Sequence, residues 1–454
     1  MSSEFWTLDR IADALAGSCA SPPRGRSAIS GISTDTRAVA AGDCFVALSG
    51  DRYDAHDFLE QAVAAGAAAL IVSRPQAQIA ALNVPVFVVR DTLIALGELA
   101  GYRRAAWGKP AVGIAGSNGK TSTKDLLSAA LGSRFTVHAT RGNLNNRVGV
   151  PLTLLALPDS ADIAVVELGT SIPGEIATLR EIAKPDIVVV TSIAEEHLEG
   201  LGDLAGVLAE ESAVFDSNSV AIIPATHPEL REPATRARKL VVAGLDSGDL
   251  RATSWSIASD GSGTAVVDGV DLHSPLRGVH NLRNLMLALA ASQELGLSTA
   301  DAARGIAQLT PPPMRASWEK IGRALVINDA YNSNPGSAFA ALDMLASAPG
   351  SQRVAILGTM RELGANSRRC HDDVARAALA SCADVIAGIG EFADSLVRLA
   401  PADPRVVTAA DVGELWTALE PRLASEPTIL LKASRGVKLE RILPLISSWA
   451  TQAC

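Results

Sequence analysis

Short apolar runs alternate with amphipathic stretches along the whole chain. In residues 1–108, the runs at 44–48, 69–72 and 86–89 are separated by Ala-rich stretches with a helical period, which predicts a small α/β unit. From residue 111, the runs AVGIA, IAVVEL and DIVVVTS predict parallel strands joined by helical crossovers. After the prolines at 311–313, the runs ALVINDA, RVAILGT, DVIAGIG and TILLKAS alternate with helices and predict a third α/β unit.

These patterns divide the chain into three predicted domains. A basic stretch that holds Gly108 and Pro110 precedes the strand at 111, so the first domain is expected to span residues 1–108. The proline run closes a central domain at 109–313 and leaves 314–454 for a C-terminal, Rossmann-like α/β domain. Within the central domain, residues 220–280 are rich in Gly, Ser, Thr and Val with little helical period, which predicts short antiparallel strands.

Composition narrows the class of protein. A chain of 454 residues with 48% hydrophobic content can bury two or three separate cores. The balance of 40 basic and 49 acidic side chains argues against nucleic acid or an anionic membrane as the main partner. Five cysteines without CxxC spacing are expected to be free thiols in a reducing compartment. The N-terminus lacks a signal-peptide pattern and no apolar run is long enough to span a membrane, so we expect a soluble, cytoplasmic protein.

A glycine-rich turn at 116–122, GSNGKTS, lies between a predicted buried strand and a predicted helix. Backbone N–H groups and the helix N-terminus can converge there on phosphate oxygens, so the segment predicts a nucleotide site in a P-loop ATPase-like central domain. Lys120 would reach the terminal phosphates, and the Thr121 hydroxyl stands where such loops bind Mg²⁺. Ile114 replaces the first glycine of the strict pattern, so a purely structural turn is the alternative, and the loop does not choose between ATP and GTP. The predicted nucleotide-binding residues are Gly116, Ser117, Asn118, Gly119, Lys120, Thr121 and Ser122.

Glu167 ends the apolar run IAVVE. In a parallel sheet this places a carboxylate at the carboxyl edge, where ligands bind and where the phosphate loop is also expected. Because Mg²⁺ prefers oxygen ligands, we predict Glu167 as a metal ligand.

Further segments occur in a fixed order from one end of the chain to the other. They are STDTR at 33–37, GDCFVAL at 42–48, YDAHDF at 53–58, GSNGKTS at 116–122, GNLNNRVGVPLTLL at 142–155, VELG and PGEI within 166–176, EHLEGLG at 196–202, HNLRNLMLALA at 280–290, DAYNSNP at 329–335, ELGANS at 362–367 and KASRG at 432–436. In this series the chain resembles the Mur ligases, the amide ligases of peptidoglycan synthesis.

The resemblance implies a role for each domain: the first holds the UDP end of the substrate, the central one ATP, and the third brings in the amine and closes over the site. It implies UDP-substrate contacts for Thr34, Thr36 and Arg37, peptide contacts for Asn143, Asn145 and Asn146, nucleotide contacts for Asn281, Asn284, Arg315, Asp329, Tyr331 and Asn332, amine-side contacts for Lys432, Ser434 and Arg435, and a second Mg²⁺ at His197. On residue type alone, TDTR is also typical of a capped turn, the Asn–Gly cluster of an ordinary turn, and KASRG of a solvated basic turn.

One departure from the family falls at the metal site. Mur ligases carry a carbamylated lysine on the helix after HLEG, whereas this chain has AEESAVF at 209–215. A gap-free alignment puts Glu211 in the lysine's place, with Glu210 beside it. Glutamate supplies a carboxylate without CO₂ but is several bonds shorter, so the second metal must shift, bind through water or be lost. TSIPGEI, Met314 and LGTM are further departures near the substrate pockets.

These features predict a ligase that uses ATP and Mg²⁺ to activate a carboxylate as an acyl phosphate, which an amine then attacks. Lys120, Glu167, His197 and Glu211 are the predicted catalytic residues. The resemblance implies UDP-N-acetylmuramoyl-tripeptide and D-Ala-D-Ala as substrates and a monomer as the working form. Two alternatives stay open: a Mur-type ligase redirected to another acid and amine, such as a folate and glutamate, and a nucleotide-binding homologue that has lost catalysis.

Overall fold

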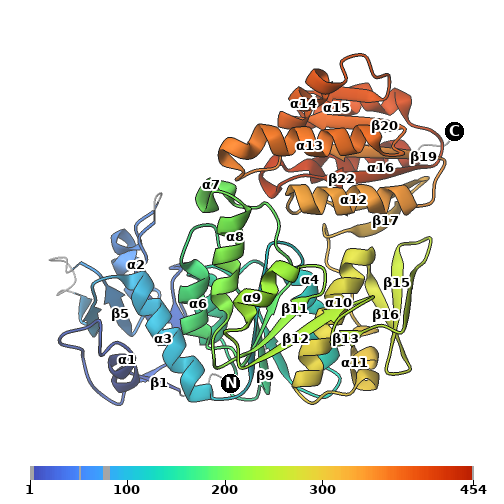
Figure 1. Ribbon diagram of the computed structural model, residues 1–454. Coiled ribbons are helices and arrows are strands. Elements are labelled where there is room, and N and C mark those ends of the chain that lie inside the picture. The colour runs from blue at the N-terminus through green and yellow to red at the C-terminus, as the bar shows by residue number, and fades with distance from the viewer. Residues whose placement is uncertain (1–4, 51–52, 75–81, 452–454) are drawn as a thin grey trace. The chain divides into compact units, whose positions relative to one another are not determined.

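The computed structural model describes residues 5–50, 53–74 and 82–451, coloured from blue to red in Figure 1. They pack into two compact units. The first comprises the described residues of Met1–Gly113, Phe135–Gly169 and Ala177–Asp186, and the second those of Ile114–Arg134, Thr170–Ile176 and Ile187–Cys454. The domain boundaries predicted at 108 and 313 stay predictions.

The first unit contains a four-stranded sheet with the order β3-β4-β5-β6, in which every pairing is parallel. Its strands are β3 (Ile32–Ser33), β4 (Cys44–Val46), β5 (Ala69–Val72) and β6 (Val86–Val88). The last three confirm the strands predicted at 44–48, 69–72 and 86–89, whereas β3 was not predicted. All four residues of β5 are buried, as expected for a parallel strand covered on both faces. Helix α3 (Thr92–Trp107) follows; Asp91 caps its first turn, and Gly108, at φ +67°, ends it.

The remaining elements of the first unit surround this sheet or belong to the central part of the sequence. They are β1 (Trp6–Thr7), α1 (Leu8–Ala14), β2 (Ala28–Ile29), α2 (Leu59–Ala64), β8 (Val137–Ala139), α5 (Gly149–Leu155) and β9 (Ile163–Glu167). Strand β8 pairs in parallel with β9. Strand β7 (Ala111–Ala115) and helix α6 (Glu175–Ala183) each have residues in both units.

In the second unit, the strands β10 (Ile187–Val190), β11 (Val220–Pro224), β12 (Lys239–Gly244) and β13 (Leu250–Arg251) run parallel in that order. The prediction of antiparallel strands throughout 220–280 is therefore wrong for its first part. β11 is buried along its whole length, which is typical of a parallel strand, and the overall composition of 220–280 did not reveal it. The antiparallel pattern is confirmed for β14 (Ser254–Ile257), β15 (Ser262–Val267) and β16 (Val270–Arg277).

The last sheet of the second unit has the order β17-β18-β22-β19-β20-β21. Strands β18 (Ala324–Asp329), β19 (Gln352–Leu357), β20 (Val385–Ile389) and β22 (Pro427–Lys432) confirm the predicted ones and pair in parallel. The sequence reading missed two edge strands, the antiparallel β17 (Ser317–Ile321) and the parallel β21 (Val406–Ala409). Their patterns are short and only partly buried, which weakens the sequence signal.

Helices complete the second unit and flank its sheets (Figure 1). They are α4 (Lys120–Leu131), α7 (Leu198–Leu201), α8 (Leu204–Glu211), α9 (Arg231–Ala234), α10 (Val279–Glu294), α11 (Thr299–Ile306), α12 (Pro335–Ser347), α13 (Ser367–Ala380), α14 (Glu391–Leu399), α15 (Val412–Leu419) and α16 (Leu443–Thr451). Trp416 of α15 and Trp449 of α16 pack with Ile429 and Val354 of the last sheet in one apolar core. The predicted α/β class, with parallel sheets in three regions of the chain, is confirmed.

The predicted free thiols are confirmed at Cys19, Cys44, Cys370 and Cys382, whereas Cys454 lies outside the described residues. Residues 1–4 of the N-terminal segment lie outside them as well. Across the described part of the chain, no helix combines the length and the apolarity that a membrane crossing requires.

Ile429 offers a test of the last sheet. Its side chain is fully buried on the central strand β22, between Val326 of β18 and Val354 of β19. We expect Ile429→Ala to lower the free energy of unfolding by about 2–5 kcal/mol through lost burial and a residual cavity. Urea unfolding followed by tryptophan fluorescence measures it, and Val397→Ala on α14, where the side chain is 54% exposed, should change it by less than about 0.5 kcal/mol. Equal effects of the two variants would contradict the central position of β22.

Candidate active site

The phosphate loop has the strand–turn–helix form that the sequence predicts. Strand β7 leads into Gly116, and α4 begins at Lys120. Gly116 and Gly119 have φ values of +114° and +88°, which side-chain-bearing residues rarely adopt. A Cβ on Gly116 would lie 2.5 Å from Thr191 Oγ1, so this turn also requires the close approach that glycine allows.

The segment after β10 forms hydrogen bonds with the backbone of the loop. Ser117 N–H donates to the Ser192 carbonyl at 2.8 Å, and Asn118 N–H donates to Ser192 Oγ at 2.8 Å. Thr191 Oγ1 donates to the Asn118 carbonyl at 2.6 Å. Three backbone groups of the turn are thus held by two neighbouring residues, which fixes the loop's shape before any ligand binds.

Lys120 folds back over the loop. Its Nζ donates to the Gly116 carbonyl and, at 3.4 Å, to the Ser117 carbonyl, and it lies 3.7 Å from Glu196 Oε1. Burial raises the pKa of Glu196, and the nearby charges of Lys120 and His197 offset only part of this effect. The lysine therefore sits at the loop as the partner of a buried carboxylate.

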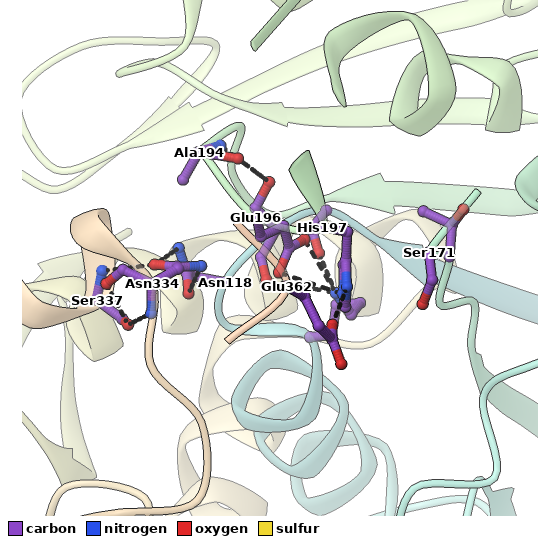
Figure 2. A network of polar contacts seen from close by, with 12 residues as sticks. Asn118, Ser171, Ala194, Glu196, His197, Asn334, Ser337 and Glu362 are labelled. Carbon is purple, nitrogen blue, oxygen red and sulfur yellow. Dashed lines mark hydrogen bonds and ion pairs between the residues drawn. The ribbon is translucent and has the colours of Figure 1, made fainter. Parts of the chain in front are cut away.

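His197 follows Glu196 and occupies the residue before α7 with φ +50°. Its Nδ1 lies 2.5 Å from Glu362 Oε2, and its Nε2 lies 3.9 Å from Glu196 Oε2 (Figure 2). Although burial disfavours the charged imidazole, the hydrogen bond that His197 donates to Glu362 and the charge of Glu196 raise the pKa of His197 overall. Glu362 thus fixes the ring and leaves Nε2 as the nitrogen that could meet a ligand.

Glu211 reaches the phosphate loop from the end of α8. Its Oε2 accepts the Gly116 N–H at 2.6 Å, and within the described part of the chain its buried Oε1 has no hydrogen-bond partner. Burial raises the pKa of Glu211 to about 7, against the opposing charge of Lys120. A buried oxygen without a hydrogen-bond partner suits a cation, so the geometry is compatible with the predicted metal ligand, which stays a prediction.

Glu210 has a different role from its neighbour. Its carboxylate accepts hydrogen bonds from Thr170 Oγ1 at 3.0 Å and from the backbone N–H groups of Gly174 and Ile176 at 2.7 and 2.8 Å. These contacts hold the start of α6. Of the two adjacent glutamates, Glu211 is therefore the one that faces the loop.

The predicted nucleotide contacts form two pairs, of which the Asn281–Asn284 pair lies beside the loop. Asn284 of α10 approaches Gly119 closely: a Cβ on that glycine would lie 2.8 Å from the Asn284 amide. Asn284 Nδ2 donates to Asn281 Oδ1 at 3.2 Å, and Asn281 Nδ2 donates to the Arg277 carbonyl at 2.8 Å. The guanidinium of Arg315 lies 4.1 Å from the Tyr331 ring centroid, a cation–π distance that pairs two predicted nucleotide residues.

The predicted amine-side residues are partly engaged within the protein. Lys432 Nζ donates to Asp329 Oδ2 at 2.6 Å and to the Asn332 carbonyl at 2.8 Å, with its side chain 3% exposed. Ser434 Oγ accepts the Arg361 N–H at 2.9 Å. Arg435 is exposed and lies 3.0 Å from Glu440 Oε1. Lys432 thus ties the ends of β22 and β18 together, a structural role that the sequence did not predict.

The remaining predicted residues belong to the first unit. Arg37 forms a fork with Asp35, at 2.9 and 2.6 Å, and this pairing lowers the pKa of Asp35 to about 2. Thr34 and Thr36 flank Asp35 in the same turn and are partly exposed. Glu167 ends β9, and its N–H donates to Thr140 Oγ1 at 2.9 Å.

The asparagine cluster at 143–146 is also part of the first unit. Asn146 Oδ1 accepts the N–H groups of Val148 and Gly149 at 3.1 and 2.9 Å and so turns the chain into α5. The Asn145 carbonyl accepts the Gly169 N–H at 2.7 Å, and the Asn143 carbonyl accepts the Asn145 N–H at 2.8 Å. The turn-forming alternative therefore describes Asn146, and the predicted peptide contacts stay predictions.

Four residues of the network carried no predicted role: Ser192, Glu196, Asn334 and Glu362. Glu196 had a usable signal, because it directly precedes His197 after a predicted parallel strand, where charged side chains gather. Glu362 and Asn334 meet partners 165 and 216 residues away, and a single sequence gives no sign of such pairings.

A phosphate loop between a parallel strand and a helix, with a lysine at the helix start, defines the class of P-loop nucleotide-binding α/β enzymes. Three family models match in order: "Mur ligase family, catalytic domain" over residues 28–104, "Mur ligase middle domain" over 114–292, and "Mur ligase, glutamate ligase domain" over 314–435. The chain belongs to the Mur ligase family, and it is an ATP-dependent amide ligase.

Relatives match over nearly their whole length. The UDP-N-acetylmuramoyl-tripeptide–D-alanyl-D-alanine ligase of Escherichia coli is 37% identical over 433 residues, covering 91% of this chain and 92% of the relative. The Bacillus subtilis enzyme of the same name is 34% identical and covers 96% and 97%. Among solved structures, MurF from Acinetobacter baumannii has a TM-score of 0.89 at 30% identity, covering 98% and 99%, and MurF from Thermotoga maritima in complex with ADP has 0.82 at 26%, covering 92% and 97%.

Gly116→Ala tests the loop. A methyl group there would meet Thr191 Oγ1 at 2.5 Å and Thr191 N at 2.7 Å, so the turn must shift. Strain of about 1–3 kcal/mol predicts ADP binding weaker by about tenfold or more, measured by isothermal titration calorimetry. Gly269→Ala is the control, since Gly269 also has a positive φ, +74°, but nothing lies within 4 Å of a Cβ there. Unchanged ADP affinity in Gly116→Ala would contradict the loop's assignment.

Proposed function

We propose that this enzyme joins D-Ala-D-Ala to UDP-N-acetylmuramoyl-tripeptide at the expense of ATP, in the cytoplasmic synthesis of the peptidoglycan precursor. The observation that carries the proposal is the phosphate loop, with Lys120 at the start of α4 and the Asn281–Asn284 pair beside Gly119. The names of the full-length relatives supply the substrates.

The reaction has two steps. First, the terminal carboxylate of the tripeptide attacks the γ-phosphorus of ATP, the bond to the β,γ-bridging oxygen breaks, and ADP leaves as an acyl phosphate forms. The amine of D-Ala-D-Ala then attacks the acyl carbon, phosphate leaves with the C–O bond electrons, and the nitrogen loses a proton as the amide forms. The product is UDP-N-acetylmuramoyl-pentapeptide, and the enzyme works as a monomer.

The residues of the loop bind and orient the nucleotide in this proposal. The Lys120 ammonium moves from the carbonyls of its own loop to the terminal phosphates, and the N-terminus of α4 faces them. Asn281 and Asn284 contact the adenine side, Arg315 contacts a phosphate, and Asp329, Tyr331 and Asn332 contact the ribose and adenine. Excluding water from the site protects the acyl phosphate from hydrolysis.

Mg²⁺ is part of the proposal, because the donors around the loop are oxygens and one imidazole nitrogen. Thr121 and Glu167 are each proposed as Mg²⁺ ligands, and His197 and Glu211 would hold a second ion, for which the buried Oε1 of Glu211 fits. When bound, Mg²⁺ neutralises phosphate charge and polarises the phosphorus centre. Thr34, Thr36 and Arg37 are proposed for the UDP end, Asn143, Asn145 and Asn146 for the peptide, and Lys432, Ser434 and Arg435 for the amine side.

The reaction can be tested by reconstitution. Purified protein with ATP, Mg²⁺, UDP-N-acetylmuramoyl-tripeptide and D-Ala-D-Ala should release phosphate, and omitting any one component should abolish the release. Mass spectrometry should find the joined peptide. Lys120→Ala should lower kcat/KM by about 10²-fold or more, because a charge that stabilises the transferring phosphoryl group is lost. ATP binding without phosphate release would exclude this acid–amine pair and favour a redirected ligase or a homologue without catalysis.

Glu211 permits a second test. The wild-type rate should not depend on bicarbonate, because Glu211 brings its own carboxylate. Glu211→Gln keeps an oxygen for the Gly116 N–H but loses the charge, and should lower kcat by about 10–100-fold. Glu211→Lys restores the family's lysine, and its activity should rise when bicarbonate is added. Full activity of Glu211→Gln would show that the carboxylate charge has no part in the reaction.

A further inference from the structure

A reciprocal amide pair joins the phosphate loop to the start of α12. Asn118 Nδ2 donates to Asn334 Oδ1 at 3.2 Å, and Asn334 Nδ2 donates to Asn118 Oδ1 at 2.9 Å. The two side chains face one another in Figure 2, although they are 216 residues apart in the sequence. Asn334 is 3% exposed, so water competes little for these two hydrogen bonds.

Asn334 also caps the N-terminus of α12, and this fixes the orientation of its side chain. Its Oδ1 accepts the Ser337 N–H at 2.9 Å as the N-cap of α12, and Ser337 Oγ accepts the Asn334 N–H at 3.0 Å, which completes a capping box. Because the oxygen must face the helix end, the Nδ2 group must point to Asn118. The N-cap role of Asn334 therefore orients its Nδ2 group toward Asn118 of the phosphate loop.

The loop side of the pair is equally constrained. Asn118 N–H and its carbonyl are both bound by Ser192, at 2.8 and 3.1 Å, and the carbonyl also accepts from Thr191 Oγ1. Gly336, in the first turn of α12, comes close to the same strip of chain: a Cβ there would lie 3.3 Å from Ala194 Cβ and 3.6 Å from Asn118 Nδ2. The pair thus connects the phosphate loop, which Thr191 and Ser192 hold, to the first turn of α12. A shift of either segment is therefore transmitted to the other.

We propose that Asn334 is a positioning residue for the nucleotide: through Asn118 it holds the phosphate loop in its binding shape. The inference rests on the proposed nucleotide role of this loop. The side chain of Asn118 is occupied by Asn334, so it supports the loop while the N-terminus of α4 meets the phosphates. Asn334 lies directly after the predicted nucleotide contacts Asp329, Tyr331 and Asn332. The amide pair therefore links the segment that holds these contacts to the phosphate loop.

The test is a double-mutant cycle on ADP affinity and on the KM for ATP. Asn334→Ser keeps a good N-cap but is too short to reach Asn118. Asn118→Ala removes the partner. Each variant should weaken ADP binding by about five- to tenfold, since two partly buried hydrogen bonds are lost. The double variant should be no weaker than either single one, and in Asn334→Ser the KM for ATP should rise by a larger factor than kcat falls.

Ser337→Ala is the matched control. It removes the capping-box bond to Asn334 N–H but leaves both amide bonds, so ADP affinity should stay within about twofold of the wild type. Hydrogen exchange without nucleotide adds a second readout: amides of residues 116–122 should exchange faster in Asn334→Ser than in Ser337→Ala.

Three results would overturn the proposal. Wild-type ADP affinity in Asn334→Ser would show that the pair does not support the nucleotide site. Additive losses in the double variant would show that Asn118 acts on the nucleotide directly. Unchanged hydrogen exchange at 116–122 would show that the loop keeps its shape without Asn334. Absence of ADP binding by the wild type would instead refute the proposed nucleotide function, and the exchange readout would still decide whether Asn334 holds the loop.

Discussion

The charge balance around Lys120 is the constraint on which the site depends. Glu196 and Glu211 are both buried near this lysine, and burying a carboxylate costs several kcal/mol unless charges and hydrogen bonds offset it. Lys120 offsets part of this cost for both, and the Gly116 N–H offsets part for Glu211. The loop, the end of α8 and the segment after β10 are therefore bound together electrostatically. A nucleotide would bring several more negative charges to the same place, which is the physical ground for proposing Mg²⁺.

The segment from Thr191 to Gly202 connects the phosphate loop to the last α/β region. On one side Ser192 binds the loop, and on the other Glu199 N–H donates to the Glu362 carbonyl at 3.1 Å. Glu195 pairs with Arg369 of α13 at 2.6 Å, on a largely exposed surface. Contacts of these kinds are worth about 0.5–1.5 kcal/mol each, so a few can be broken and remade during a catalytic cycle.

The sequence predicted best where one local pattern determines the structure. The GSNGKTS turn was readable because glycines at 116 and 119 are needed for left-handed backbone and close approach. Buried strands such as β10 and β22 were readable from their unbroken apolar runs. The error at β11 came from judging residues 220–280 by their overall composition, although their glycines and serines all lie after residue 243. Lys432 illustrates the limit at the site: its position after a strand was clear, but its pairing with Asp329, 103 residues away, follows from tertiary packing.

Glu211 stands where the resemblance to the family places a carbamylated lysine. A carbamylated lysine reaches several bonds further than a glutamate, so the shorter side chain must bring its carboxylate close to the loop. Glu211 does so by accepting the Gly116 N–H at 2.6 Å, which anchors one oxygen and leaves the other buried oxygen facing inward. Burial raises the pKa of Glu211 to about 7, and a bound cation would favour the charged form. In the proposed metal site, the substitution would replace a ligand made by CO₂ with one whose charge depends on the bound ion.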